Sequence, residues 1–185
     1  MIAAMYLLVK HPKIIEKLRS ELELVGADPS GSKIANLEHL NGVINETLRL
    51  FPPVPTAIHR KTPPEGITID GTYLPGDMNV WCSQYILGRS ETVYSQPDKF
   101  VPERWYQFPE MIKDRTAFAP FSTGPYGCIG KPLAMLNIRT TLAQLVMNFD
   151  IKFAPGGSDF VFEENAVDHF VLSFGELNLC FTERQ

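Results

Sequence analysis

A glycine-rich loop, FSTGPYGCIGKP at residues 121–132, surrounds the cysteine Cys128. Its glycines recur at every third position, which relieves the backbone of Cβ clashes and lets the chain wrap tightly with N–H groups turned inward. Pro132 indicates the first turn of a following helix. A thiol at a helix N-terminus meets the positive end of the helix dipole, which favours the thiolate form. The loop therefore has the composition of a site that holds a sulfur anion.

Several kinds of site combine a cysteine with a tight loop. A phosphate-binding loop is excluded, because Pro125 and Pro132 stand where that loop needs Gly and Ser or Thr. A cysteine nucleophile needs a histidine base, and none of the four histidines lies in a recognisable protease setting. A thiolate ligand to haem iron needs one cysteine with backbone donors around it. A buried cysteine without chemistry, packed as a small hydrophobic residue, remains open at this point.

Two further motifs precede this loop. The first, ETLR at residues 46–49, places Glu46 and Arg49 opposite the apolar stripe of a helix. Taken alone, this spacing predicts an exposed ion pair worth a few tenths of a kcal/mol. The second, PERW at residues 102–105, predicts a Pro-bounded turn in which Arg104 is followed by an aromatic residue.

Periodicity and chain breakers indicate the elements that must position these motifs. We expect helices over about residues 1–25, 36–51 and 132–149, with Asn36 as the N-cap of the second. Residues 52–131 predict a loop-rich meander with short β pieces, and residues 150–185 predict a β-rich tail with a hairpin turn at 174–176. The expected fold class is α+β, mainly α with small β elements, in a single domain over residues 1–185.

Composition excludes several classes of protein. The 185 residues are 44% hydrophobic with a net charge of −4, which suits a packed core and argues against disorder. The acidic balance, without a cluster of basic residues, argues against a nucleic-acid partner. The 15 prolines, about 8% against a usual ~5%, argue against a continuous helical bundle. The three cysteines form no CxxC pair, so a structural zinc site or a redox dithiol is unsupported.

The ordered set of ETLR at 46–49, PERW at 102–105 and FSTGPYGCIG at 121–130 resembles the signature of the cytochrome P450 family of haem-thiolate monooxygenases. VKHPKIIEKLRSEL before the set and SFGELNLCFTER at the end extend the similarity over about residues 1–185. The segment FSTGPYGCIGKPLA most resembles the corresponding segment of family members from filamentous fungi.

The resemblance implies a fold, the C-terminal and therefore incomplete part of the P450 fold, and a set of site residues. Cys128 would be the axial thiolate ligand of the haem iron. A buried structural network behind the haem would consist of Glu46, Arg49 and Arg104, which contradicts the exposed pair expected from the helix pattern. Residues expected near the cofactor are Arg60, Phe121, Gly124, Tyr126 and Gly130. Residues expected along the substrate pocket are Val54, Thr56, Ala57 and Ile58.

The resemblance also implies an activity, the insertion of one oxygen atom from O2 into a small lipophilic substrate, in fungi as part of secondary metabolism. The implied cofactor is haem b (iron protoporphyrin IX), with electrons from NADPH through a reductase as redox partner. The family expectation for localisation is the cytosolic face of the endoplasmic reticulum membrane, although this chain carries no anchor.

Two departures from the family pattern bear on the implied function. The position two before the cysteine usually carries a basic residue, and here it is Tyr126. The distal helix that delivers protons to bound dioxygen would lie upstream of Met1. The alternatives are therefore a catalytically inactive fragment without that helix, or a soluble interaction domain if the motif set is coincidental.

Overall fold

The computed structural model describes residues 1–26, 31–56, 58–156 and 159–184. The α-helices in these ranges are α1 (Ile2–Lys10), α2 (Pro12–Glu23), α3 (Glu38–Leu50), α4 (Gln84–Gly88), α5 (Lys131–Asn148) and α6 (Asp159–Glu164). The strands are β1 (Arg60–Lys61), β2 (Ile67–Ile69), β3 (Thr72–Leu74), β4 (Asn79–Val80), β5 (Phe149–Phe153), β6 (Val167–His169), β7 (Val171–Ser173) and β8 (Leu179–Glu183). Short 3-10 turns are η1 (Gly31–Ile34), η2 (Pro102–Trp105), η3 (Pro109–Met111), η4 (Arg115–Ala117) and η5 (Gly124–Tyr126). The predicted α+β class, mainly helical with small strands, is confirmed.

The helix predicted over residues 1–25 is divided into α1 and α2. Pro12 begins α2 and has no N–H to continue the hydrogen bonding of α1, so the chain turns at His11, with φ −128° and ψ 70°. The two helices therefore present their apolar faces at different angles to the rest of the core.

The helix predicted over 36–51 begins at Glu38, and its N-cap is Leu37 rather than Asn36. The carboxylate of Glu21 in α2 accepts the backbone N–H groups of His39 at 2.8 Å and Leu40 at 2.9 Å. This distant side chain satisfies two of the donors that a local N-cap would serve. Because the contact is not local, the sequence around residue 36 could not reveal it.

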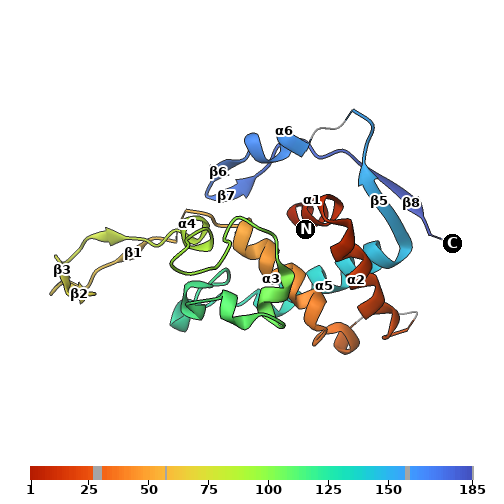
Figure 1. The fold of residues 1–185 in the computed structure, drawn as a ribbon. Coiled ribbons are helices and arrows are strands. Elements are labelled where there is room, and N and C mark those ends of the chain that lie inside the picture. Colours follow the sequence, from red (N-terminus) through yellow and green to blue (C-terminus); the bar gives the residue numbers. More distant parts are fainter. Residues whose placement is uncertain (27–30, 57, 157–158, 185) are drawn as a thin grey trace.

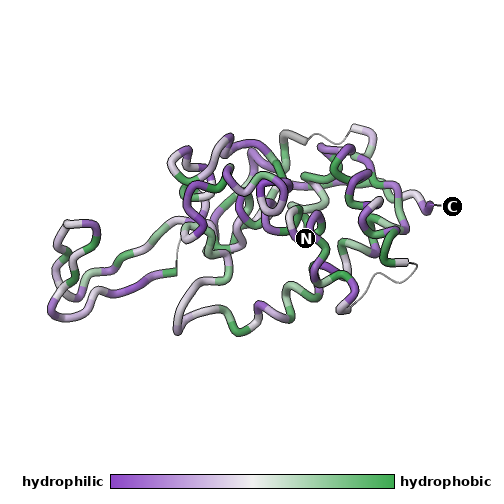
Figure 2. The backbone as a smooth tube through the Cα atoms, turned by 60° about the horizontal axis from the view of Figure 1, so that its bottom comes forward, coloured by the Kyte–Doolittle hydropathy of each residue, from purple (hydrophilic) through white to green (hydrophobic). Residues whose placement is uncertain are grey.

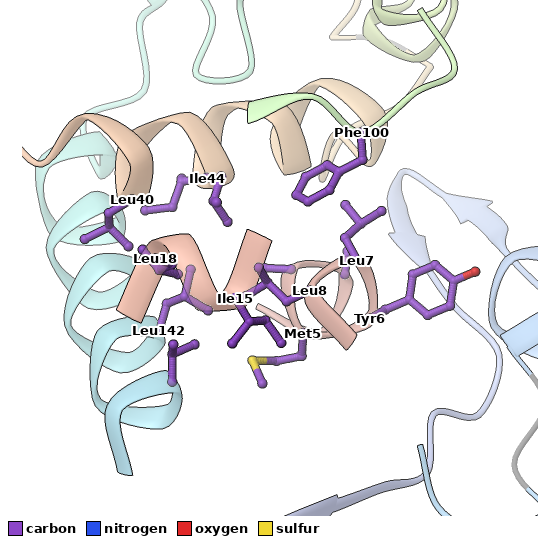
Figure 3. Close-up of a cluster of buried hydrophobic side chains, with 14 of the residues drawn as sticks. Met5, Tyr6, Leu7, Leu8, Ile15, Leu18, Leu40, Ile44, Phe100 and Leu142 are labelled. Carbon is purple, nitrogen blue, oxygen red and sulfur yellow. The ribbon is translucent and has the colours of Figure 1, made fainter. Parts of the chain in front are cut away.

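The core lies where α1, α2, α3 and α5 meet. Leucine and isoleucine side chains of α2 point toward α3 and α5 in the close-up, with Phe100 closing one end (Figure 3). The fully buried residues of this packing include Leu8, Leu18, Leu40 and Leu142, all 0% exposed. Tyr6 leaves the cluster in the opposite direction, toward the C-terminal segment, where its hydroxyl donates to Glu163 of α6 (Figure 3).

All four sheets are two-stranded and antiparallel, with pairings β1–β4, β2–β3, β5–β8 and β6–β7 in the described ranges. The first two pairs form an arm that projects from the helical body in both views (Figures 1 and 2). The pair β5–β8 follows directly from α5, and the hairpin β6–β7 lies with α6 beside α1 (Figure 1).

The turn predicted at residues 174–176 is wrong. The hairpin turns four residues earlier, at Phe170, which has a positive φ of 74°. Phe174 instead packs in the core, stacked on Phe162 with ring centroids 4.5 Å apart. Burial of this aromatic ring therefore outweighs the local turn preference of the following glycine.

None of the helices in the described ranges is long and apolar enough to cross a lipid bilayer.

Candidate functional site

Cys128 lies in an exposed loop directly before α5. The backbone N–H of Cys128 donates to the carbonyl of Phe121 at 2.7 Å, which closes the loop on itself. Gly124 has a positive φ of 66° at the start of η5, a conformation that glycine adopts without strain. Gly130 is the N-cap of α5, and a Cβ there would lie 3.7 Å from the Cys128 sulfur. Because the thiol is exposed, the interpretation of Cys128 as a buried structural residue is wrong.

Arg60 of β1 reaches this loop from the arm. Its guanidinium donates to the hydroxyl of Ser122 at 3.2 Å, and its Cζ lies 5.1 Å from the ring centroid of Tyr126. The structure therefore brings Arg60 and Tyr126 together, as a cation over an aromatic face. Ser122 is a contact that the motif alone did not reveal, because it depends on how the arm meets the loop.

Glu46 of α3 lies at the centre of a buried charge network. Its carboxylate accepts two hydrogen bonds from Arg49, at 2.8 and 2.9 Å, and one from Arg104 at 2.8 Å. The indole N–H of Trp105 donates to it at 2.9 Å, and the backbone N–H of Val101 donates at 3.0 Å. Glu46, Arg49 and Arg104 have fully buried side chains. Five donors thus replace the water that this carboxylate would lose on burial.

Arg49 and Arg104 carry two positive charges, and Glu46 neutralises one of them. Backbone carbonyls accept hydrogen bonds from the remaining N–H groups of the two arginines. Arg49 donates to Gly88, Pro97 and Lys99, and Arg104 donates to Ser95, Gln96 and Lys99. Both guanidinium groups also face the ring of Tyr94, at 5.0 and 5.9 Å. The network therefore fixes the chain between α4 and η2 onto α3.

The exposed pair expected from the helical pattern of α3 is wrong. The polar face of α3 is covered by η2, and the carbonyl of Pro102 approaches Gly42 so closely that a Cβ there would lie 2.6 Å from it. A helical wheel cannot anticipate a cover that comes from a segment more than fifty residues away. Glu103, by contrast, points outward and pairs with Lys17 of α2 at 2.9 Å.

The segment expected along a substrate pocket lies beside the β6–β7 hairpin. The carbonyl of Pro53 accepts the N–H of Leu172 at 2.9 Å, and the Thr56 hydroxyl donates to Asp168. Val54 is half-buried. Ala57 lies outside the described residues.

Ile58 is 46% exposed and lines a cavity of about 430 Å³ between the arm and the cysteine loop. The residues around this cavity are Ile58, Arg60, Ile69, Val80, Trp81, Cys82, Gln84, Ala119, Ser122 and Thr123. The cavity has an apolar wall and one cationic side chain, which suits an apolar group with an anionic edge.

Comparisons with known proteins identify the family of this chain. The cytochrome P450 family model matches residues 1–181. The chain is 50% identical to "Cytochrome P450 monooxygenase notG'" of Aspergillus versicolor over an alignment of 186 positions. This alignment covers 98% of this chain and 34% of that protein. The chain is 48% identical over 183 residues to "Tryprostatin B 6-hydroxylase" of Aspergillus fumigatus, covering 97% of this chain and 33% of that protein.

A third relative, "Cytochrome P450 monooxygenase sthD" of Phaeosphaeria nodorum, is 48% identical over 182 residues, covering 97% of this chain and 38% of that protein. The chain thus spans about a third of the length of the curated relatives it matches, and it corresponds to their C-terminal portion. With the family model matching nearly every residue and fungal monooxygenases as relatives, this chain belongs to the cytochrome P450 family.

Proposed function

We propose that this chain forms the proximal, thiolate-bearing part of a haem-dependent monooxygenase, with Cys128 as the axial ligand of the haem iron. The observation that carries the proposal is an exposed thiol held at the N-terminal end of an 18-residue helix by a loop closed on the Phe121 carbonyl. A helix N-terminus favours negative charge beside it, and a thiolate ligand carries such a charge.

The residues around Cys128 fit a flat, apolar group with acidic substituents. Ile129 is 99% exposed and Leu133 is 63% exposed, so the chain presents apolar surface next to the sulfur. The glycine at position 130 adds no side chain between the sulfur and α5. The guanidinium of Arg60 lies at the same loop and can pair with a carboxylate of the bound group.

Bound haem would supply the chemistry of dioxygen activation and the transfer of one oxygen atom to a C–H bond. The residues of this chain would perform the supporting tasks. Cys128 would donate its sulfur electron pair, Arg60 would neutralise a propionate, and Tyr126 packs against Arg60 at the position where the family pattern has a basic residue. The network around Glu46 holds the meander behind the loop, so that the sulfur keeps its position.

We further propose a small lipophilic substrate, hydroxylation as the reaction, and a reductase that passes on electrons from NADPH. The names of the relatives support the type of reaction: one is a tryprostatin B 6-hydroxylase and two are named monooxygenases. The pocket residues would come from 54–58 and from the β6–β7 hairpin that is bonded to this segment.

An absorption spectrum of the haem-loaded protein tests the ligand. The reduced protein with carbon monoxide should show the red-shifted Soret band of thiolate ligation, and Cys128→Ala should lose it. Cys180→Ala, which removes an exposed thiol of β8 outside the lining of the cavity between the arm and the cysteine loop, is the matched control and should keep the band. An unchanged band in Cys128→Ala would rule out the assignment.

A chimera tests whether the chain serves as the C-terminal third of an active enzyme. The aligned 97% of this chain would replace its counterpart in tryprostatin B 6-hydroxylase, which is 48% identical there. We expect tryprostatin B hydroxylation to persist and to disappear in the Cys128→Ala chimera. A chimera that shows the thiolate band without any hydroxylation would favour an inactive fragment.

A further inference from the structure

Trp105 contacts residues of two hydrophobic clusters. On one side its ring packs against a small cluster formed by Val93, Tyr94 and Ile112. On the other side it contacts Phe118, with ring centroids 4.4 Å apart and an angle of 51° between the planes. Phe118 in turn packs against the main core of the helices. The indole is therefore a side-chain contact between the meander cluster and the segment that leads into the cysteine loop, beside the packing of Ala117.

The orientation of this indole is fixed by a hydrogen bond to a buried charge. Its Nε1–H donates to Glu46 at 2.9 Å, and Glu46 is itself held by both arginines and a backbone N–H. A hydrogen bond to a charged acceptor is stronger than one between neutral groups. A phenylalanine at this position would fill much of the same space but would have no donor to set the ring plane.

Hydrogen bonds continue from the residues after Phe118 to the cysteine. The next residue, Ala119, donates its N–H to the side chain of Gln84 at 2.9 Å. Phe121, two residues further, accepts the N–H of Cys128 at 2.7 Å. The segment 118–121 is thus held at its start by Trp105 and Gln84, and Cys128 is bonded to its end.

We infer that Trp105 is a positioning residue for Cys128: its N–H bond to Glu46 orients the ring against Phe118 and thereby fixes the segment to which the Cys128 amide is bonded. The assignment rests on the proposed function for its chemical consequence, the geometry of thiolate ligation. Its structural part, the restraint of the loop, stands on the contacts of this chain alone.

The test compares Trp105→Phe with Ile112→Ala in the full, haem-loaded protein that contains this chain. Trp105→Phe removes the N–H donor and keeps an aromatic ring, whereas Ile112→Ala loosens the packing of the same cluster without removing the hydrogen bond. Hydrogen exchange of the Cys128 amide is the first measurement. We expect about fivefold faster exchange in Trp105→Phe, the factor that corresponds to one lost hydrogen bond, and little change in Ile112→Ala.

The ferrous carbon monoxide spectrum is the second measurement. A larger share of the ordinary Soret band is expected in Trp105→Phe and not in Ile112→Ala. Phe118→Leu removes the ring contact from the other side and should reproduce both effects, and the double variant should add nothing further, as expected for residues that act through one contact.

Equal effects of Trp105→Phe and Ile112→Ala would overturn the inference, because packing alone would then explain them. Unchanged exchange in Trp105→Phe would overturn it as well. Failure of the proposed function is seen separately, as an unmodified protein without the thiolate band, and the exchange measurement would still decide whether Trp105 restrains the loop.

Discussion

The Nε atom of Arg104 donates to the carboxylate of Glu46 at 2.8 Å across 58 positions of sequence, and both side chains are fully buried. This bond fastens η2 to α3, the helix that carries Glu46. It also leaves the pair without access to water, so replacing Arg104 removes a buried donor of the Glu46 carboxylate, and replacing Glu46 leaves two buried guanidinium groups without an anion.

Arg104→Met should destabilise the protein by about 3–5 kcal/mol, because the Glu46 carboxylate loses a buried partner while most of the side-chain volume is retained. Urea unfolding measures the change. Arg115→Met, at an exposed arginine of η4, is the control and should change the free energy of unfolding by less than about 0.5 kcal/mol. Similar losses of unfolding free energy in the two variants would contradict a stabilising role of the buried network.

Local patterns were sufficient for the parts of this fold that depend on near neighbours. The helix expected over 132–149 is found at Lys131–Asn148, and the β piece at 67–69 is found as β2. The loop around Cys128 could be predicted as well, because its glycines and the following helix lie within twelve residues. The break between α1 and α2 was not predicted, although Pro12, which begins α2, is a local signal for it.

Distant contacts account for what the sequence could not reveal. The cap of α3 comes from Glu21, and the cover over Glu46 comes from η2. The ring contact between Trp105 and Phe118 and the approach of Arg60 to Tyr126 also join residues that no periodicity relates. Charged and aromatic side chains can also take many exposed conformations, and only the tertiary packing determines that the buried conformation is adopted.

Tyr94→Phe should leave the protein as stable or make it more stable. Tyr94 is 1% exposed, and its hydroxyl has no hydrogen-bond partner among the described residues. An unsatisfied buried hydroxyl costs about 1–3 kcal/mol, so its removal relieves that cost. Burial also raises the pKa of Tyr94 to about 12, so the hydroxyl stays protonated at neutral pH.

Tyr6→Phe is the matched comparison, since Tyr6 is equally buried but bonds to Glu163 and Lys10. This variant should lose about 1–2 kcal/mol in thermal or urea unfolding. A stability loss in Tyr94→Phe as large as that in Tyr6→Phe would contradict the assignment of an unpaired hydroxyl.

Gly42→Ala should destabilise the protein, although alanine normally favours a helix interior by about 1 kcal/mol over glycine. A Cβ at this position would lie 2.6 Å from the carbonyl oxygen of Pro102, which is backbone and cannot move without shifting η2. Ser20→Ala on the exposed face of α2 is the comparison: it raises helix propensity without a backbone clash, and it loses the exposed bond of the Ser20 hydroxyl to the Glu16 carbonyl at 3.1 Å. Denaturant unfolding of both variants decides the point, and a gain in stability for Gly42→Ala would refute the close approach.

Acid should weaken the fold through His39. The ring is 2% exposed, with Nδ1 2.9 Å from the hydroxyl of Tyr106 and Nε2 3.3 Å from the carbonyl of Ile14. A neutral ring with its proton on Nε2 satisfies both contacts, accepting from Tyr106 and donating to Ile14. Burial lowers the pKa of His39 below its ordinary value of 6.5, and Lys17 acts in the same direction, against the opposing effects of Ile14, Glu103 and Glu21.

Below about pH 6.5 the unfolded chain therefore binds a proton at this residue more readily than the folded chain does. The free energy of unfolding falls as the pH drops through this window, down to the pKa of the folded state. Urea unfolding at about pH 7.5 and about pH 5.5 should show a smaller loss on acidification in His39→Gln than in the unmodified protein. Because the other histidines and all carboxyl groups are common to both proteins, the difference isolates His39, and identical losses would mean that this ring is protonated equally in the folded and unfolded chains.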